Sequence, residues 1–156
     1  MLKLTVVHRR QSIAKRTRLA GRMKIVVGYD GSDAAKRALE SAASLGGDQA
    51  RIVVVAVAEP YPRSGITIPA NLDPVENRQR RHDLDEARQF LSERGIETET
   101  IQARGKPADA LVEAARDADL AIVGSRGLNR LQRLILGSVS SKLVHRAACD
   151  VLIVRL

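Results

Sequence analysis

Five strand-like runs alternate along this chain with stretches of helical periodicity, and this order constrains the fold more than any other feature. The runs are residues 24–29, 51–58, 96–104, 120–123 and 151–156. Helical stretches cover 33–45, 75–94 and 138–147, and another begins at Pro107. The run 51–58 is apolar on both faces, as a buried parallel strand must be. The order predicts an α/β fold: a single open five-stranded parallel sheet with right-handed crossovers and helices on both faces.

Two of the connections after strands are rich in glycine. In open sheets of this class, ligands bind beyond the carboxyl ends of the strands, where the winding direction reverses. The first strand runs into Gly28-Tyr29-Asp30-Gly31-Ser32, and the fourth into Gly124-Ser125-Arg126-Gly127. These two connections would face each other across the crevice if the first and fourth strands are neighbours.

A second glycine pattern follows the fourth strand. Nine residues, 128–136, separate Gly127 from the pair Gly137-Ser138, which stands at the start of a helix. Glycines let backbone N–H groups approach a bound group closely, and a helix N-terminus adds unpaired N–H donors and a favourable dipole. The pattern indicates an anion cradle, to which the hydroxyls of Ser138 and Ser140 and the backbone N–H of Val139 would contribute.

Each of these residues also has a purely structural interpretation. Gly124 and Gly127 are compatible with a tight turn alone, and Ser138 with an ordinary N-cap. Asp30 is either a turn residue or an acceptor for ribose hydroxyls or adenine. Arg126 and Arg130 are either phosphate partners or solvated charges.

Charge and composition exclude several classes of function. Residues 1–22 hold seven of the 26 basic residues and none of the 18 acidic ones, so the remainder is close to neutral. The three aromatic residues are scattered, which argues against a stacking platform for nucleic acid. The single Cys149 and three separated histidines predict no disulfide, no metal site and a cytoplasmic setting, and no apolar run is long enough to span a bilayer.

The basic segment 1–22 has three interpretations. Its composition fits a targeting peptide or a disordered basic arm, and Met23, directly before the first strand, is an alternative start of translation. In none of the three do we expect this segment to belong to the core.

Residues 23–156 resemble the ATP-binding branch of the universal stress protein family. The resemblance rests on MKIVVGYDGSDAAKRAL, on DLAIVGSRG, on the ending GSVSSKLVHRAACDVLIVRL, and on Gly124, Gly127, Gly137 and Ser138 in the family's GxxG, nine residues, G(S/T) signature. It implies a Rossmann-like, adenine nucleotide alpha hydrolase-like sheet with strand order 3-2-1-4-5, which makes strands one and four neighbours.

The resemblance also implies a site and partners. The residues expected at the nucleotide are Gly28, Tyr29, Asp30, Val57, Gly124, Ser125, Arg126, Gly127, Gly137, Ser138, Val139 and Ser140. Asp30 would contact the nucleoside, Val57 would pack on adenine, Gly124 would lie against the ribose, and the last glycine-serine group would hold the phosphates. Tyr29 replaces the small residue of many relatives, so we expect it to crowd or stack on the base. Dimerisation through Val151 to Leu156 is also implied.

The expected function is a regulatory module that binds ATP, with or without Mg²⁺, and presents a surface to an unidentified protein partner. The catalytic sequences SGGxDS, HxGH and KMSKS of related nucleotide-binding proteins are absent, and no general base is evident, so we expect little or no hydrolysis. The alternatives are a weak ATPase or nucleotide-processing enzyme and a nucleotide-independent interaction scaffold.

Overall fold

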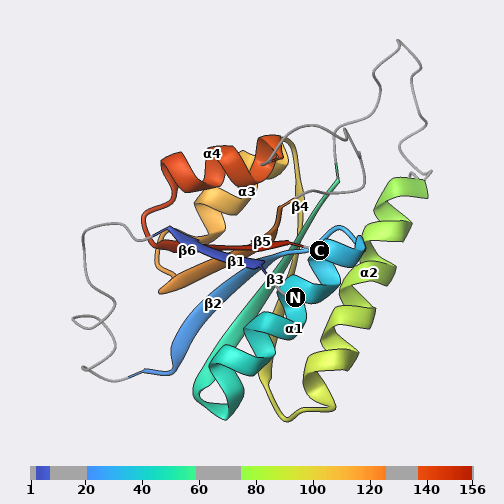
Figure 1. Ribbon diagram of the computed structural model, residues 1–156. Helices are drawn as coiled ribbons and strands as arrows, with labels where there is room; N and C mark the ends of the chain where they lie inside the picture. The colour runs from blue at the N-terminus through green and yellow to red at the C-terminus, as the bar shows by residue number, and fades with distance from the viewer. Residues whose placement is uncertain (1–2, 8–20, 59–74, 126–136, 156) are drawn as a thin grey trace.

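The computed structural model describes residues 3–7, 21–58, 75–125 and 137–155 (Figure 1). The strands are β1 (Lys3–Val7), β2 (Met23–Gly28), β3 (Ala50–Ala58), β4 (Glu97–Arg104), β5 (Leu120–Gly124) and β6 (Asp150–Arg155). The helices are α1 (Asp33–Gly46), a short 3₁₀ helix (Gly47–Gln49), α2 (Val75–Ser92), α3 (Pro107–Ala114) and α4 (Ser138–Arg146). The five predicted strands are therefore present, each within about two residues of its expected bounds.

The strands form one sheet in the order β1-β6-β5-β2-β3-β4. The strands from β2 onward pair in parallel, which confirms the predicted parallel sheet and its order 3-2-1-4-5. β1 was not expected: it pairs antiparallel with β6 at the outer edge. Part of the segment predicted to lie outside the domain thus adds a sixth strand to the sheet.

Helices cover both faces of the sheet, as expected. Figure 1 shows α1 and α2 on one face and α3 and α4 on the other. The alternation of side chains along each strand divides the core into two layers. Ile25, Val27 and Leu152 point to the α1 and α2 side, and Val26, Val123 and Ile153 point to the α3 and α4 side.

The helix ends follow from local sequence. Ser32 caps α1, because its Oγ accepts the backbone N–H of Ala35 at 3.2 Å. Pro107 is the first residue of α3, where its missing N–H costs nothing. α2 ends at Ser92, because Gly95 adopts φ +68° and Ile96 donates its N–H back to the carbonyl of Leu91.

Within the described part of the chain, no helix combines the length and apolar character needed to cross a membrane. The long connection 59–74, predicted as an irregular loop, lies outside the described residues.

Candidate functional site

The two glycine-rich connections meet at one edge of the sheet. β2 and β5 are direct neighbours, with Val26 opposite Ala121 and Val27 opposite Ile122. Because paired parallel strands end at the same edge, the residues that follow Gly28 and Gly124 begin side by side. This confirms that the two strands are neighbours, which is the condition under which the two connections were expected to face each other.

The connection from β2 to α1 is a turn held by its own polar groups. Asp30 Oδ1 accepts the backbone N–H of Ser32 at 3.0 Å. Gly31 has φ +80°, a conformation that L side chains rarely adopt, and a Cβ there would lie 3.0 Å from Asp83 Oδ1. The turn therefore requires glycine at this position and fixes the carboxylate of Asp30 at its start.

A buried arginine from α2 supports this turn. Arg80 Nη1 donates to the backbone carbonyl of Asp30 at 2.9 Å and lies 3.0 Å from Asp83 Oδ2. Both charged side chains are buried, and Gln79 Nε2 donates to the other oxygen of Asp83 at 2.9 Å. α2 thus holds the Asp30 turn through a buried ion pair.

The sequence interpretation missed Arg80 and Asp83, although a signal was present. They share the helix face of Leu84, Ala87 and Leu91, which is the apolar, core-facing side of α2. Charged residues are rarely buried on such a face unless they have partners. Two charged residues at core-facing positions of this helix therefore indicated a buried ion pair.

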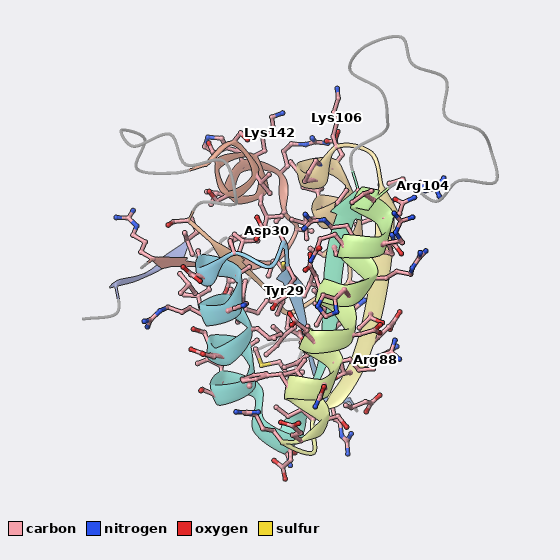
Figure 2. All side chains as sticks on the ribbon, turned by 90° about the vertical axis from the view of Figure 1, so that its right-hand side faces the viewer. Tyr29, Asp30, Arg88, Arg104, Lys106 and Lys142 are labelled. Atoms are coloured by element: carbon pink, nitrogen blue, oxygen red, sulfur yellow. The ribbon has the colours of Figure 1, made fainter. Side chains whose placement is uncertain are left out.

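Tyr29 does not lie where a base could contact its ring. Its side chain is 5% exposed and belongs to the core layer under α1 and α2, because it continues the alternation of Ile25 and Val27. Burial, aided by the carboxylates of Glu86, Asp83 and Asp30, raises the pKa of Tyr29 to about 12. The expectation that Tyr29 would crowd or stack on the base is therefore wrong. Figure 2 shows it below Asp30, toward the interior.

Hydrogen bonds bring together the two ends of the connection between β5 and α4. Ser125 donates its backbone N–H to the carbonyl of Val154 at 2.8 Å, and Gly137 donates its N–H to the carbonyl of Ser125 at 2.8 Å. Arg126, Gly127 and Arg130, three residues of the predicted cradle and its neighbourhood, lie between these ends and outside the described residues. The closure nevertheless brings the start of α4 to the end of β5.

Gly137, and not Ser138, is the N-cap of α4. Its backbone is extended, with φ −71° and ψ 164°, and it contributes no capping side chain. The first turn of α4, Ser138 to Ser140, therefore presents backbone N–H groups without a side-chain cap. Ser138 is exposed and Val139 half-buried, which is compatible with an anion at this helix N-terminus.

Ser140 serves the fold instead. Its side chain is 2% exposed, and its one hydroxyl hydrogen is shared between two acceptors, because Oγ lies 3.1 Å from the carbonyl oxygen of Gly137 and 3.4 Å from that of Ser125. This hydroxyl helps to close the connection, so its predicted contact with a phosphate is not supported.

Gly28 and Gly124 have packing reasons of their own. A Cβ on Gly124 would lie 2.7 Å from the Cβ of Ala34, at the start of α1, and 3.0 Å from its backbone carbonyl carbon. A Cβ on Gly28 would lie 3.0 Å from methyl groups of Leu111 and Val123. Both glycines let helices approach the sheet, whatever they contact in a ligand.

The match to a protein-family model decides the family. The universal stress protein family model matches residues 21–155, which is most of the chain. The chain belongs to the universal stress protein family.

Its relatives support the assignment over nearly their whole length. This universal stress protein is 34% identical over 145 residues to universal stress protein YxiE of Bacillus subtilis, covering 85% of this chain and 98% of the relative. It is 38% identical over 135 residues to a universal stress protein of Thermus aquaticus, covering 84% and 97%. A crystal structure of a universal stress protein in complex with cAMP is 31% identical, with a TM-score of 0.66, and the match covers 87% of this chain and 98% of that one.

The candidate site of this universal stress protein is the edge above β2 and β5. It combines Asp30, the exposed Ser138 and the first turn of α4, with Val57 half-buried at the end of β3 on the α3 and α4 side. Figure 2 shows Arg104, Lys106 and Lys142, all exposed, toward the same end of the molecule as Asp30. No group of three or more metal-ligating side chains occurs among the described residues.

Proposed function

We propose that this universal stress protein binds ATP at the carboxyl edge of β2 and β5 and acts as a nucleotide-dependent regulatory module. The observation that carries the proposal is the start of α4: its N-cap is a glycine, its first turn has no capping side chain, and hydrogen bonds through Ser125 hold it at the carboxyl end of β5, the strand next to β2. A helix N-terminus without a side-chain cap is suited to an anion.

Each described residue has a definite part in this proposal. The backbone N–H groups of Ser138 and Val139 and the Ser138 hydroxyl would bind phosphate oxygens. Asp30 would accept from the nucleoside, and Val57 would supply an apolar contact for adenine. ATP supplies the negative charge that matches the α4 dipole and the nearby cations. The relative that was crystallised with cAMP supports an adenine nucleotide as the ligand class.

The proposal includes slow hydrolysis at most. Serine hydroxyls are poor bases, and the Oδ1 of Asp30, the carboxylate placed in this turn, already accepts the Ser32 N–H. We expect phosphate release by the pure protein to be slower than about one turnover per second, the low end of ordinary enzymes. Faster release that is lost in Asp30→Ala would favour the enzymatic alternative.

Ser138→Asp tests the proposed phosphate contact without harming the fold. A carboxylate in the first turn stabilises a helix by about 0.3–1 kcal/mol, but it would repel phosphate from the same N–H groups. ATP at 100 times its Kd should raise the wild-type melting temperature by about 5–10 °C. We expect Ser138→Asp to melt no lower than wild type without ligand and to lose most of this shift.

Ser138→Asn is the matched neutral control. It has nearly the same shape as Ser138→Asp and leaves the N–H groups available, so most of the ATP-induced shift should remain. If Ser138→Asp keeps the full shift, the phosphates do not bind at α4 and the proposed site is wrong.

A further inference from the structure

β1 occupies the outer edge of the sheet beside β6. The two strands pair over five residues, from Lys3 opposite Arg155 to Val7 opposite Val151. This pair is antiparallel, whereas the four other strand pairs of the described sheet are parallel. Figure 1 shows β1 lying along β6, on the far side of the sheet from β4. The edge that the sequence predicted as a dimer contact is therefore covered within the chain.

Without β1, β6 would be an exposed edge strand composed mainly of apolar residues. Val151, Leu152, Ile153 and Val154 are all buried, with side chains that pack into both core layers. The outer backbone N–H and C=O groups of such a strand are unpaired unless another strand adds to it. Removal of β1 would therefore leave an edge that another strand can complete.

Symmetry determines in which direction the β6 strand of a second copy would run along this edge. A two-fold axis beside an edge strand places the partner's strand antiparallel to it, and the contact is then self-complementary. β1 has this antiparallel direction on the same edge. A strand from the same chain thus stands where the β6 strand of a second copy would pair.

β1 can leave without disturbing β2. Residues 8–22 join the two strands and, fully extended, span at most about 50 Å. The amino end of β2 lies three strand spacings from β1, or about 14 Å, and Val7 and Met23 both lie toward the amino end of β6 and β2, respectively. The length of the connection therefore allows β1 to be paired or released while the five parallel strands stay in place.

We propose that β1 competes with a second copy of the chain for the outer edge of β6, the edge through which the family resemblance implies dimerisation. With β1 paired, the chain is a monomer. With β1 displaced, two chains pair through β6. This proposal is independent of nucleotide binding, and its tests contain no nucleotide.

A disulfide across the observed register tests the pairing. In Lys3→Cys/Arg155→Cys the two thiols are directly opposite each other, and we expect oxidation to give a bond within one chain on a non-reducing gel. Leu4→Cys/Arg155→Cys, one residue out of register, is the control and should crosslink poorly. The native Cys149 should not interfere, because burial raises its pKa to about 11 and little thiolate forms near neutral pH. A bond between two chains, or none, would overturn the intramolecular contact.

Prolines in β1 test the competition. Alternate residues of an edge strand direct their N–H groups to the neighbouring strand, so Thr5→Pro/Val6→Pro removes at least one such donor. We expect light scattering to report a monomer for the wild type and twice that mass for this variant. Ser12→Pro/Ile13→Pro, outside β1, should remain monomeric. At equal concentration, a monomeric Thr5→Pro/Val6→Pro chain, or a wild type as fully dimeric as this variant, would overturn the proposal.

If the proline variant fails to fold, the disulfide variant still tests whether β1 competes with a second copy for the edge of β6. Reduced Lys3→Cys/Arg155→Cys should gain mass as its concentration is raised, because β1 can leave, and the oxidised form should not. Equal masses in the two redox states at every concentration would show that β1 does not compete with a second copy.

Discussion

At the scale of single residues, the site depends on a charged pair that faces the core. Arg80 joins three features: the helix α2, the buried carboxylate of Asp83 and the backbone of the Asp30 turn. Its Nε is buried and has no hydrogen-bond partner among the described residues. Such a pair fixes the position of the turn more than it stabilises the fold, because burial of both charges offsets much of their attraction.

Arg80→Met should destabilise the protein by about 3 kcal/mol, because it leaves the Asp83 carboxylate buried without its counter-charge. Urea unfolding measures this loss. Arg88→Met on the same helix is the control: Arg88 is exposed, and its Nη2 donates to Thr100 Oγ1 at 2.7 Å, so its loss should cost well under about 1 kcal/mol. Arg80→Met/Asp83→Leu should recover part of the stability. Equal losses for Arg80→Met and Arg88→Met would contradict the buried pair.

Cys149 should make stability depend on pH in the alkaline range. Burial raises its pKa from 9.0 to about 11, so above pH 9 the unfolded chain releases a proton that the folded chain keeps. The free energy of unfolding should therefore fall as the pH rises from 9 toward 11, by an amount on the order of 2 kcal/mol in total. Cys149→Ala should show a flatter slope between pH 9 and 11; Tyr29, whose pKa burial raises from 10.0 to about 12, is present in both proteins and contributes equally to both slopes. Parallel slopes for the two proteins would contradict the burial of this thiol.

At the scale of elements, close approaches of helix to sheet determine where the glycines stand. Gly124 ends β5 directly against the first turn of α1, and Gly28 ends β2 beneath α3. Both were predicted as ligand residues from their place after a strand. That reasoning could not separate a backbone that approaches a ligand from one that approaches a helix, since both require the absence of a Cβ.

Gly124→Ala should destabilise the protein by about 1–3 kcal/mol without any ligand, because its Cβ would lie 2.7 Å from the Ala34 Cβ and the α1 backbone cannot move away easily. Gly28→Ala is the control. Its nearest atoms, at 3.0 Å, are side-chain methyl groups of Leu111 and Val123, which can shift more easily than backbone, so its cost should be smaller. Thermal unfolding of both variants checks the order. The reverse order would show that α1 does not pack on Gly124 as described.

At the scale of the whole molecule, the parallel sheet could be predicted from the sequence and its sixth strand could not. Alternating strand-like and helical runs indicate crossover units, and these restrict the topology strongly. β1 lies in a segment whose basic, acid-free composition suggested an arm, although the run Leu4-Thr5-Val6-Val7 is itself strand-like. A pairing between residues about 150 positions apart leaves no periodic signal in a single sequence.

The site was predictable only in part for a related reason. Asp30, Gly137 and Ser138 follow strands or begin a helix, so their places could be inferred from element order alone. Tyr29 and Ser140 could be placed only once their buried faces were known: Tyr29 continues the alternation of β2, and Ser140 turns its hydroxyl to two carbonyls. Side-chain direction, more than position along the chain, separates residues that can line the candidate site from residues that hold the fold.

Isothermal titration of the wild-type chain with ATP tests the central claim most directly. We predict saturable binding with one ATP per chain and clearly weaker binding of adenosine, because the N–H groups at the start of α4 contact phosphate. Absence of heat with ATP at millimolar concentration, or equal affinity for ATP and adenosine, would contradict a phosphate site at this edge of the sheet.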